Sequence, residues 1–436
     1  MSESIPTRAE RYADHRAHLP GAGLAWLDRL RDAAMDAFTR TGLPTRRMED
    51  WKYVDLRALA ETDWRPAGPG LIVRADLPPP LVRDGERIVL VDGRFRADLS
   101  DRIAGVEGLT ILSLHDALTA GDPLAAAAFG PCEWHARAPL IALNTAMAGD
   151  GVVLSVADGA RIERPVEVLH WTTAHDAPAE IHARHAILLH ERARATVIER
   201  FAGANGAAVF ANHGCHVALA MGASLDHIRV QSEPANLVHI AATGATLAQG
   251  AVYRGGYVGL GAATARVDLN AALLGERAEL DLAAVYLARG AQQNDLTTRI
   301  QHAARACSSA QLVKGVVAGR ARGVFQGAIH VDQDAQKTEA KQYSRALLLS
   351  PLAEVDTKPE LRIFADDVQC AHGAAIGELN RDHLFYLRAR GIDEPTARAL
   401  LVEAFIAEVV ERIPDADVRA LVAGLTAAWL AEETDR

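Results

Sequence analysis

The sequence predicts a mainly β protein, a parallel β-helix with helical segments before and after it. Between about residues 140 and 331, short alternating β-rich segments follow one another, separated by Gly, Asn and Asp turns. Comparable segments start roughly every 20–30 residues, a period that indicates stacked repeats. Aromatic residues make up only 5% of the chain, which fits a narrow core between closely stacked coils. A β-sandwich or jelly roll remains the alternative, because spacing alone does not define strand direction.

The length and composition fit a soluble protein of several domains. The chain has 436 residues, of which 49% are hydrophobic and 23% charged, as in ordinary globular proteins. We expect an N-terminal helical and mixed domain over residues 1–139, a β-helix core over 140–375 and a C-terminal helical domain over 376–436. The net charge of −10 disfavours a nucleic-acid-binding protein and a protein that docks on an anionic membrane.

The protein is expected to be cytoplasmic. Its N-terminus lacks the apolar core of a secretory signal, and no stretch approaches the roughly 20 apolar residues of a membrane span. The four cysteines, Cys132, Cys215, Cys307 and Cys370, stand far apart and form no CxxC motif. Isolated cysteines are typical of reduced thiols rather than of disulfides, zinc ribbons or ferredoxin-type clusters.

Two features are expected before the β-rich region. Residues 22–41 are predicted to form a helix that ends at Gly42. In residues 45–59, Trp51 and Tyr53 alternate with basic residues. This pattern fits either a docking surface or, as we favour, aromatic side chains that pack beneath the N-terminal domain while the charges stay solvated.

Three amphipathic helices are predicted at the C-terminus. Asn380 is a good N-cap for the first helix, and Gly391 suits its end. Asp393 begins the second helix, Pro414 ends it, and a third helix follows. Such short helices need the β-helix, one another or another protein to pack against.

No nucleotide-binding motif is present in the sequence. The P-loop signature is absent, so the chain itself is expected to bind no nucleotide. The glycines of GGYVGLGAATA (255–265) miss the dinucleotide-binding pattern and are expected to form tight turns within the repeats.

Two groups of histidine and cysteine have weak metal-binding character. His213 and Cys215 share a face of a predicted strand, while His216 points to the other face. At most two ligands therefore converge, and we favour packing roles in a β coil. Cys132 and His135 have helical ligand spacing but lack a second pair of ligands.

Cys370 and His372 are the strongest candidates for metal-binding side chains. In an extended segment both project from one face, about 7 Å apart along the strand. Thiolate and imidazole are both competent ligands of iron. Two ligands cannot complete a cluster, so we expect a transient site at an interface with another chain. Asp366 and Asp367 precede the pair and either add oxygen ligands or stay solvated.

A polysaccharide-active enzyme is the alternative that a β-helix itself raises. Such enzymes need paired carboxylates in an exposed groove and aromatic platforms for sugar rings. The low aromatic content and the absence of an export signal disfavour this alternative.

The block that begins at Phe325 contains FQGAIHVDQDAQKTEAKQYSRALLLS and ADDVQCAHGAAIGELNRDHLFYLRARG. This block resembles the SufB/SufD family of iron–sulfur cluster assembly proteins. DGARIERPVEVLH (158–170) and RRMEDWKYVDL (46–56) are similar to other recurring stretches of the family. The chain has few cysteines and none in residues 342–350, which makes it more similar to the SufD than to the SufB members.

This resemblance implies a right-handed parallel β-helix and a role as a non-catalytic scaffold subunit of the SUF assembly complex. It implies two partners, a SufB-like subunit at the edge of the β-helix and a SufC-like ABC-type ATPase at the C-terminal helices. A transient iron–sulfur cluster would form at the subunit interface, with His372 as the first candidate ligand and Cys370 as the second. A SufB-like homodimeric scaffold is the nearer alternative. The residues expected to bind the ATPase are Leu384, Phe385, Tyr386, Leu401 and Phe405.

Overall fold

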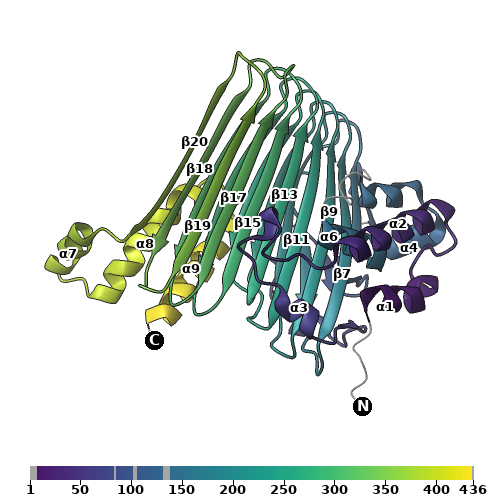
Figure 1. The fold of residues 1–436 in the computed structure, drawn as a ribbon, viewed down its shortest axis with the longest axis horizontal. Helices are drawn as coiled ribbons and strands as arrows, with labels where there is room; N and C mark the ends of the chain where they lie inside the picture. Colours follow the sequence, from purple (N-terminus) through teal and green to yellow (C-terminus); the bar gives the residue numbers. More distant parts are fainter. Residues whose placement is uncertain (1–6, 83–84, 102–105, 131–137, 435–436) are drawn as a thin grey trace.

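The computed structural model describes residues 7–82, 85–101, 106–130 and 138–434. Its centre is a stack of coils whose strands form two sheets, with helices from both ends of the chain beside it (Figure 1). In this part of the chain, no helix is long and apolar enough to cross a membrane.

We call the two sheets sheet A and sheet B. Sheet A contains β1 (Arg65–Pro66), which pairs with β7, and, from one edge to the other, β19 (Glu354–Ile363), β17 (Arg322–Val331), β15 (Gln293–His302), β13 (Thr264–Leu273), β11 (Leu237–Leu247), β9 (Val209–Leu219), β7 (Ala179–Leu189), β5 (Val152–Val156) and β4 (Leu109–Ser113). Sheet B contains, in the same direction, β20 (Gln369–Glu378), β18 (Glu339–Leu348), β16 (Ser308–Val317), β14 (Glu279–Ala288), β12 (Val252–Gly259), β10 (Ser224–Gln231), β8 (Arg194–Gly203), β6 (Val166–Thr172), β2 (Glu86–Val91) and β3 (Arg94–Phe95).

The pairing of these strands confirms the predicted parallel β-helix. From β5 to β19 in sheet A and from β2 to β20 in sheet B, apart from the short β3, neighbours run parallel. The chain therefore alternates between the sheets and advances by one coil with every second strand. Antiparallel pairing, as in a β-sandwich or jelly roll, is confined to β2 with β3 and β4 with β5 among the described strands.

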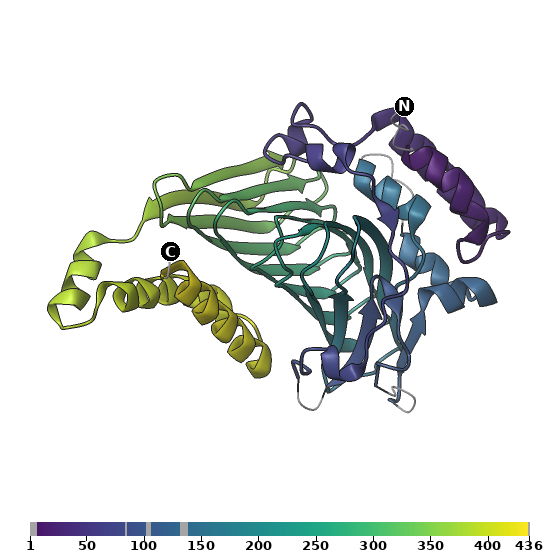
Figure 2. The same ribbon diagram turned by 90° about the horizontal axis from the view of Figure 1, so that it is seen from below.

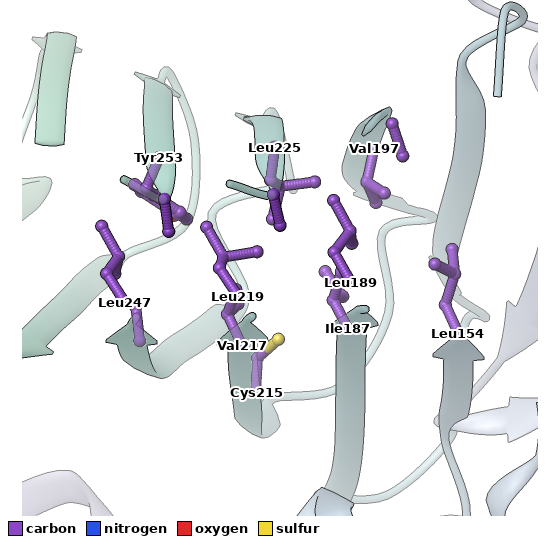
Figure 3. Packing of buried hydrophobic residues seen from close by; sticks show 14 of the residues in the cluster. Leu154, Ile187, Leu189, Val197, Cys215, Val217, Leu219, Leu225, Leu247 and Tyr253 are labelled. Carbon is purple, nitrogen blue, oxygen red and sulfur yellow. The ribbon is translucent and has the colours of Figure 1, made fainter. Parts of the chain in front are cut away.

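The interior between the sheets is filled largely by aliphatic side chains. Ile187, Val217 and Leu247 of sheet A face Val197 and Leu225 of sheet B, and all five are buried (Figure 3). Successive residues of a strand point to opposite faces, so every second residue contributes to this core. Its regular layers give each coil the same width and fix the position of the next.

The glycines of residues 255–265 correct a sequence prediction, because most of them lie in β12 rather than in tight turns. A Cβ atom on Gly255 would lie 2.9 Å from the ring of Tyr253. A Cβ atom on Gly259 would overlap the hydroxyl of Tyr257. Both tyrosines are buried, so the glycines make room for two large interior side chains.

The N-terminal helices cover the outer face of sheet A. α2 packs on α6, and both α6 and η4 contact β7 and β9. Figure 2 shows these helices and the C-terminal helices on opposite sides of the stack. Their bounds are α1 (Arg8–His15), η1 (Arg16–His18), α2 (Ala25–Thr41), η2 (Glu49–Trp51), α3 (Arg57–Glu61), η3 (Arg74–Asp76), α4 (Leu114–Ala120), η4 (Pro123–Phe129) and α6 (Pro139–Met147).

Two of these N-terminal elements test the sequence reading. α2 lies within the predicted helix and ends at Gly42, whose φ of +71° favours glycine. Trp51 is buried, and the Arg266 guanidinium lies 4.0 Å from the centre of its ring, which confirms packing for Trp51. Tyr53 is only half-buried. The helix α6 was not predicted. All its residues are buried, so it lacks the polar face that marks a helix in a sequence.

The predicted C-terminal helices are confirmed as α7 (Arg381–Ala389), α8 (Glu394–Val410) and α9 (Ala416–Thr434). The Asn380 side chain caps α7 by accepting hydrogen bonds from the backbone N–H groups of Asp382 and His383. α8 lies on the outer face of β14 and β16, and α9 packs on α8. α7 contacts α8 and extends past the end of the stack (Figure 1).

Candidate functional site

The last coil leaves one edge of each sheet open. Among the described strands, β19 pairs only with β17, and β20 pairs only with β18. Each edge strand is ten residues long. The outer backbone N–H and C=O groups of such strands are free to pair with another chain. We call this end of the stack, made by β19 and β20, the open end.

His372 and Cys370 lie on the inward-facing side of β20. The register places Cys370 beside Ala340 and His372 beside Gln342 in β18. Ala340 and Gln342 are fully buried in the interior, and in-register parallel neighbours share a face. His372 is nevertheless exposed and Cys370 only partly buried, because no further coil covers them.

A short polar row leads inward from His372. Gln311 in β16, Gln342 in β18 and His372 in β20 are register partners on successive coils. The amide of Gln342 has no hydrogen-bond partner among the described residues, whereas Gln311 accepts a 2.7 Å hydrogen bond from the Thr298 hydroxyl. Opposite Gln342 stands Gly327, where a Cβ atom would overlap the amide. Polar groups therefore reach the open end from inside the stack.

The environment of Cys370 keeps its thiol protonated in the isolated chain. Partial burial raises the pKa of Cys370 above its ordinary value, because a low-dielectric environment disfavours the thiolate. A metal ion reverses this preference, since a coordinating thiol loses its proton. Without a metal ion or a base to remove its proton, the Cys370 thiol is therefore a poor nucleophile.

The open end by itself offers an incomplete set of ligands. Within the described residues, neither His372 nor Cys370 belongs to a group of three or more converging metal-ligating side chains. Asp367 is paired with Lys337 and is exposed on the turn before β20. Remaining ligands for an iron–sulfur cluster here would have to come from outside this chain. Cys132 and His135 lie outside the described residues.

Sequence reasoning missed a second set of histidines in the interior. His170, His185, His213 and His239 approach one another inside the first coils. His213 and Cys215 are buried as expected, but the neighbours of His213 come from strands far away in the sequence. No local spacing marks such a group.

The candidate ATPase-binding residues of α7 lie on the surface. Phe385 is 74% exposed and Tyr386 58% exposed, and Leu384 is half-buried. No residue of α7 is buried. Large apolar side chains on a projecting helix are typical of interaction surfaces.

The two candidates in α8 have a different environment. Phe405 is half-buried and packs with the apolar residues between α8 and sheet B. The Lys314 ammonium lies 4.9 Å from the centre of its ring and donates a 2.5 Å hydrogen bond to its carbonyl oxygen. Leu401 is also half-buried. Phe405 therefore joins α8 to the β-helix, whatever it contributes to a partner.

A cavity of about 590 Å³ lies over the outer face of sheet A and extends to β19. Its charged groups are paired internally. Arg266 contacts Asp268 and Asp295, and Lys358 contacts Glu49. The Lys358–Glu49 pair joins the segment around Trp51 to the sheet, and the cavity is apart from the inward-facing side of His372.

Comparisons with known proteins agree with this architecture. The family described as "SUF system FeS cluster assembly, SufBD core domain" matches residues 170–405, and the "SufBD protein N-terminal region" matches residues 6–78 and 79–168. The chain is 33% identical over 384 residues to the iron–sulfur cluster assembly protein SufD of Escherichia coli (strain K12), covering 86% of each chain. It is 30% identical over 401 residues to an iron–sulfur cluster assembly SufBD family protein of Synechocystis, covering 89% of this chain and 88% of the relative. It is 29% identical to the protein ABCI7, chloroplastic, of Arabidopsis thaliana over 425 residues.

Proposed function

Because the chain belongs to the SufB/SufD family of iron–sulfur cluster assembly proteins and is most like SufD, we propose that it is a non-catalytic scaffold subunit. In this proposal it acts in the cytoplasm, pairs with a SufB-like subunit and binds a SufC-like ATPase. The observation that carries the proposal is the position of His372, inward-facing yet exposed, on the edge strand β20.

The open end supports pairing with a SufB-like subunit. A family member with the same coil would extend both sheets through the unpaired edges of β19 and β20. The side chains there favour coverage, because Phe364, Ile376 and Ile363 are 60%, 47% and 40% exposed. A joint between two stacks would therefore bury apolar surface and satisfy the edge backbone groups.

The nascent cluster is proposed to be cargo at this joint. His372 supplies an imidazole and Cys370 a thiol on the side of this chain, and the SufB-like subunit supplies the remaining ligands. A site divided between two subunits can open when the joint shifts. This division fits a cluster that is built and then passed on.

The C-terminal helices support binding of the ATPase. α7 presents Phe385 and Tyr386 to solvent, and only Leu379 and Asn380 separate it from the end of β20 at Glu378. A force on α7 therefore acts directly on the strand that carries His372. α8 stays attached to sheet B through Phe405 and Lys314.

The test is cluster formation in the reconstituted complex with His372→Ala, and separately with Cys370→Ala. We expect His372→Ala to lower the anaerobically measured cluster absorption several-fold while the complex stays intact in size-exclusion chromatography. The control is His330→Ala. His330 lies on β17 and is also partly exposed, but it pairs with Asp332, which follows that strand. Undiminished cluster formation in an intact His372→Ala complex contradicts the site assignment.

A homodimeric scaffold is the second candidate, because the same open end could receive a second copy of this chain. The mass of the isolated protein, with and without a SufB-like subunit, separates the two arrangements. A stable dimer that a SufB-like subunit does not dissociate would favour the homodimer.

A further inference from the structure

The interior of the first coils contains a group of polar side chains that the open end does not use. His170 comes from β6, His213 from β9, and His239 from β11, and Glu233 follows the end of β10. Each of the four is at most 5% exposed. The group therefore lies inside the stack, several coils away from His372 along both sheets.

The four side chains belong to two overlapping groups of possible metal ligands. One ligand atom each of His213, Glu233 and His239 lies within 4.8 Å of the others, and in the second group His213 is equally close to His170 and His185. His239 Nδ1 is 2.9 Å from Glu233 Oε2. Neighbouring ligand atoms on a metal with bonds of about 2.0–2.2 Å are separated by roughly 3 Å. Small side-chain movements would therefore complete the geometry.

Buried ring nitrogens without a hydrogen-bond partner make this group available for a bound ion. Nδ1 of His213 and both ring nitrogens of His170 lack a hydrogen-bond partner among the described residues. Buried polar atoms nearly always have a partner. His170 Nε2 lies 3.5 Å from Glu199 Oε1, close to the arrangement in which a carboxylate orients a metal-binding imidazole. That contact directs Nδ1 of His170 away from Glu199 and leaves it available.

His185 lies beside the group but is not a ligand. The backbone N–H of Val152 donates a 3.1 Å hydrogen bond to His185 Nδ1. This nitrogen must be unprotonated, so in the neutral ring the proton is on Nε2. His185 can therefore donate a hydrogen bond into the group but has no free lone pair for a metal.

The charge state of the group suits a cation. Glu233 adds a carboxylate, held by a 2.9 Å hydrogen bond from Gln231 Nε2. The Arg229 guanidinium is paired with Glu199.

We propose that His213, His239 and Glu233, joined by His170 once its ring turns toward them, bind one divalent transition-metal ion inside the β-helix. Three imidazoles and one carboxylate are ligands that Zn²⁺ and Fe²⁺ both accept. The ion links β6, β9, β11 and the turn after β10, so it fastens consecutive coils together. It is separate from the cluster that is proposed as cargo at the open end.

The test measures metal content in a His372→Ala, Cys370→Ala background, so that metal at the open end does not contribute. We expect about one zinc or iron ion per chain in the protein purified without added metal, because a buried site retains its ion. His213→Gln should lower this content by roughly tenfold or more, since it removes a central ligand. His302→Gln is the matched control, because His302 is equally buried but bonds Ser309, and it should keep the metal.

A refolding experiment covers the case in which His213→Gln does not fold. The background protein is unfolded with a chelator and refolded anaerobically with Zn²⁺, with Fe²⁺ or without metal. We expect one of the two ions to be retained after desalting and to raise the Tm. X-ray absorption should give a nitrogen and oxygen shell at about 2.0–2.2 Å. The proposal is overturned if both the purified and the refolded protein contain less than a tenth of an ion per chain. It is also overturned if His213→Gln contains as much metal as the background protein. In either case, internal water would occupy this position.

Discussion

Gln342 and His372 are register partners on the same inward face of sheet B, yet Gln342 is fully buried and His372 is exposed. The difference arises because β20 is the last described strand of sheet B, so no further described strand covers the next position. His372 thus has the orientation of a core residue and the accessibility of a surface residue. This combination supports the proposal that a second subunit completes its environment.

Pairing at the open end should be sensitive to charge on the inward face of β20. Ile376 lies four residues after His372 on β20, so its side chain points to the same inward face, and it is 47% exposed. Ile376→Lys should weaken association with a SufB-like subunit by roughly two orders of magnitude, since burying an unpaired ammonium costs several kcal/mol. Sedimentation of the mixed subunits measures this effect.

The matched control for that change is Ala375→Lys, which places the same charge on the opposite face of β20. It should leave the folded state intact and weaken association much less. If Ile376→Lys associates like the unmodified chain, or if both variants weaken association equally, the inward face of β20 is not the contact surface.

Phe385 and Phe405 should separate partner binding from stability. Phe385→Ala removes a side chain that is 74% exposed, so the Tm should stay unchanged while co-purification with a SufC-like ATPase is lost. Phe405→Ala removes packing between α8 and sheet B and should lower the free energy of unfolding by about 1–3 kcal/mol. Thermal unfolding and pull-down of the same two variants check this. A bound ATPase with Phe385→Ala would remove α7 from the proposed interface.

Gly323 should not tolerate a larger side chain. A Cβ atom on Gly323 would overlap the ring of Tyr286, which is fully buried between Gly323 and Gly315. Gly323→Ala should therefore destabilise the protein by about 1–3 kcal/mol in urea unfolding. Gly424→Ala is the control, because a Cβ atom there meets nothing within 4 Å and should stabilise α9 by about 0.5–1 kcal/mol. Equal stability of the two variants would contradict the close packing around Tyr286.

Stability should fall in mild acid partly because of His302. Burial lowers the pKa of His302 to about 4, below its value of about 6.5 in an unfolded chain. Between these values the unfolded state binds more protons, so the free energy of unfolding falls as the pH falls, by about 1.4 kcal/mol per pH unit. His302→Gln should reduce this slope between about pH 6.5 and 4 in urea titrations. An unchanged slope would mean that His302 is protonated in the folded protein.

The sequence by itself determined the features that depend on local chemistry. Short alternating β-rich segments predicted the strands, because side chains of a strand alternate between core and solvent. Asn380 and Gly391 predicted the bounds of α7, because caps and left-handed glycines act within one turn. The spacing of Cys370 and His372 predicted that both share one face.

Only the tertiary structure decided the features that depend on contacts between distant segments. α6 is buried on all sides by α2 and sheet A, so no amphipathic pattern revealed it. The inward direction of His372 follows from its register with Gln342. His170, His213 and His239 come together because each coil returns the chain to the same interior, which places residues of separate coils side by side. A linear sequence carries no sign of that proximity, since the stacking of coils alone creates it.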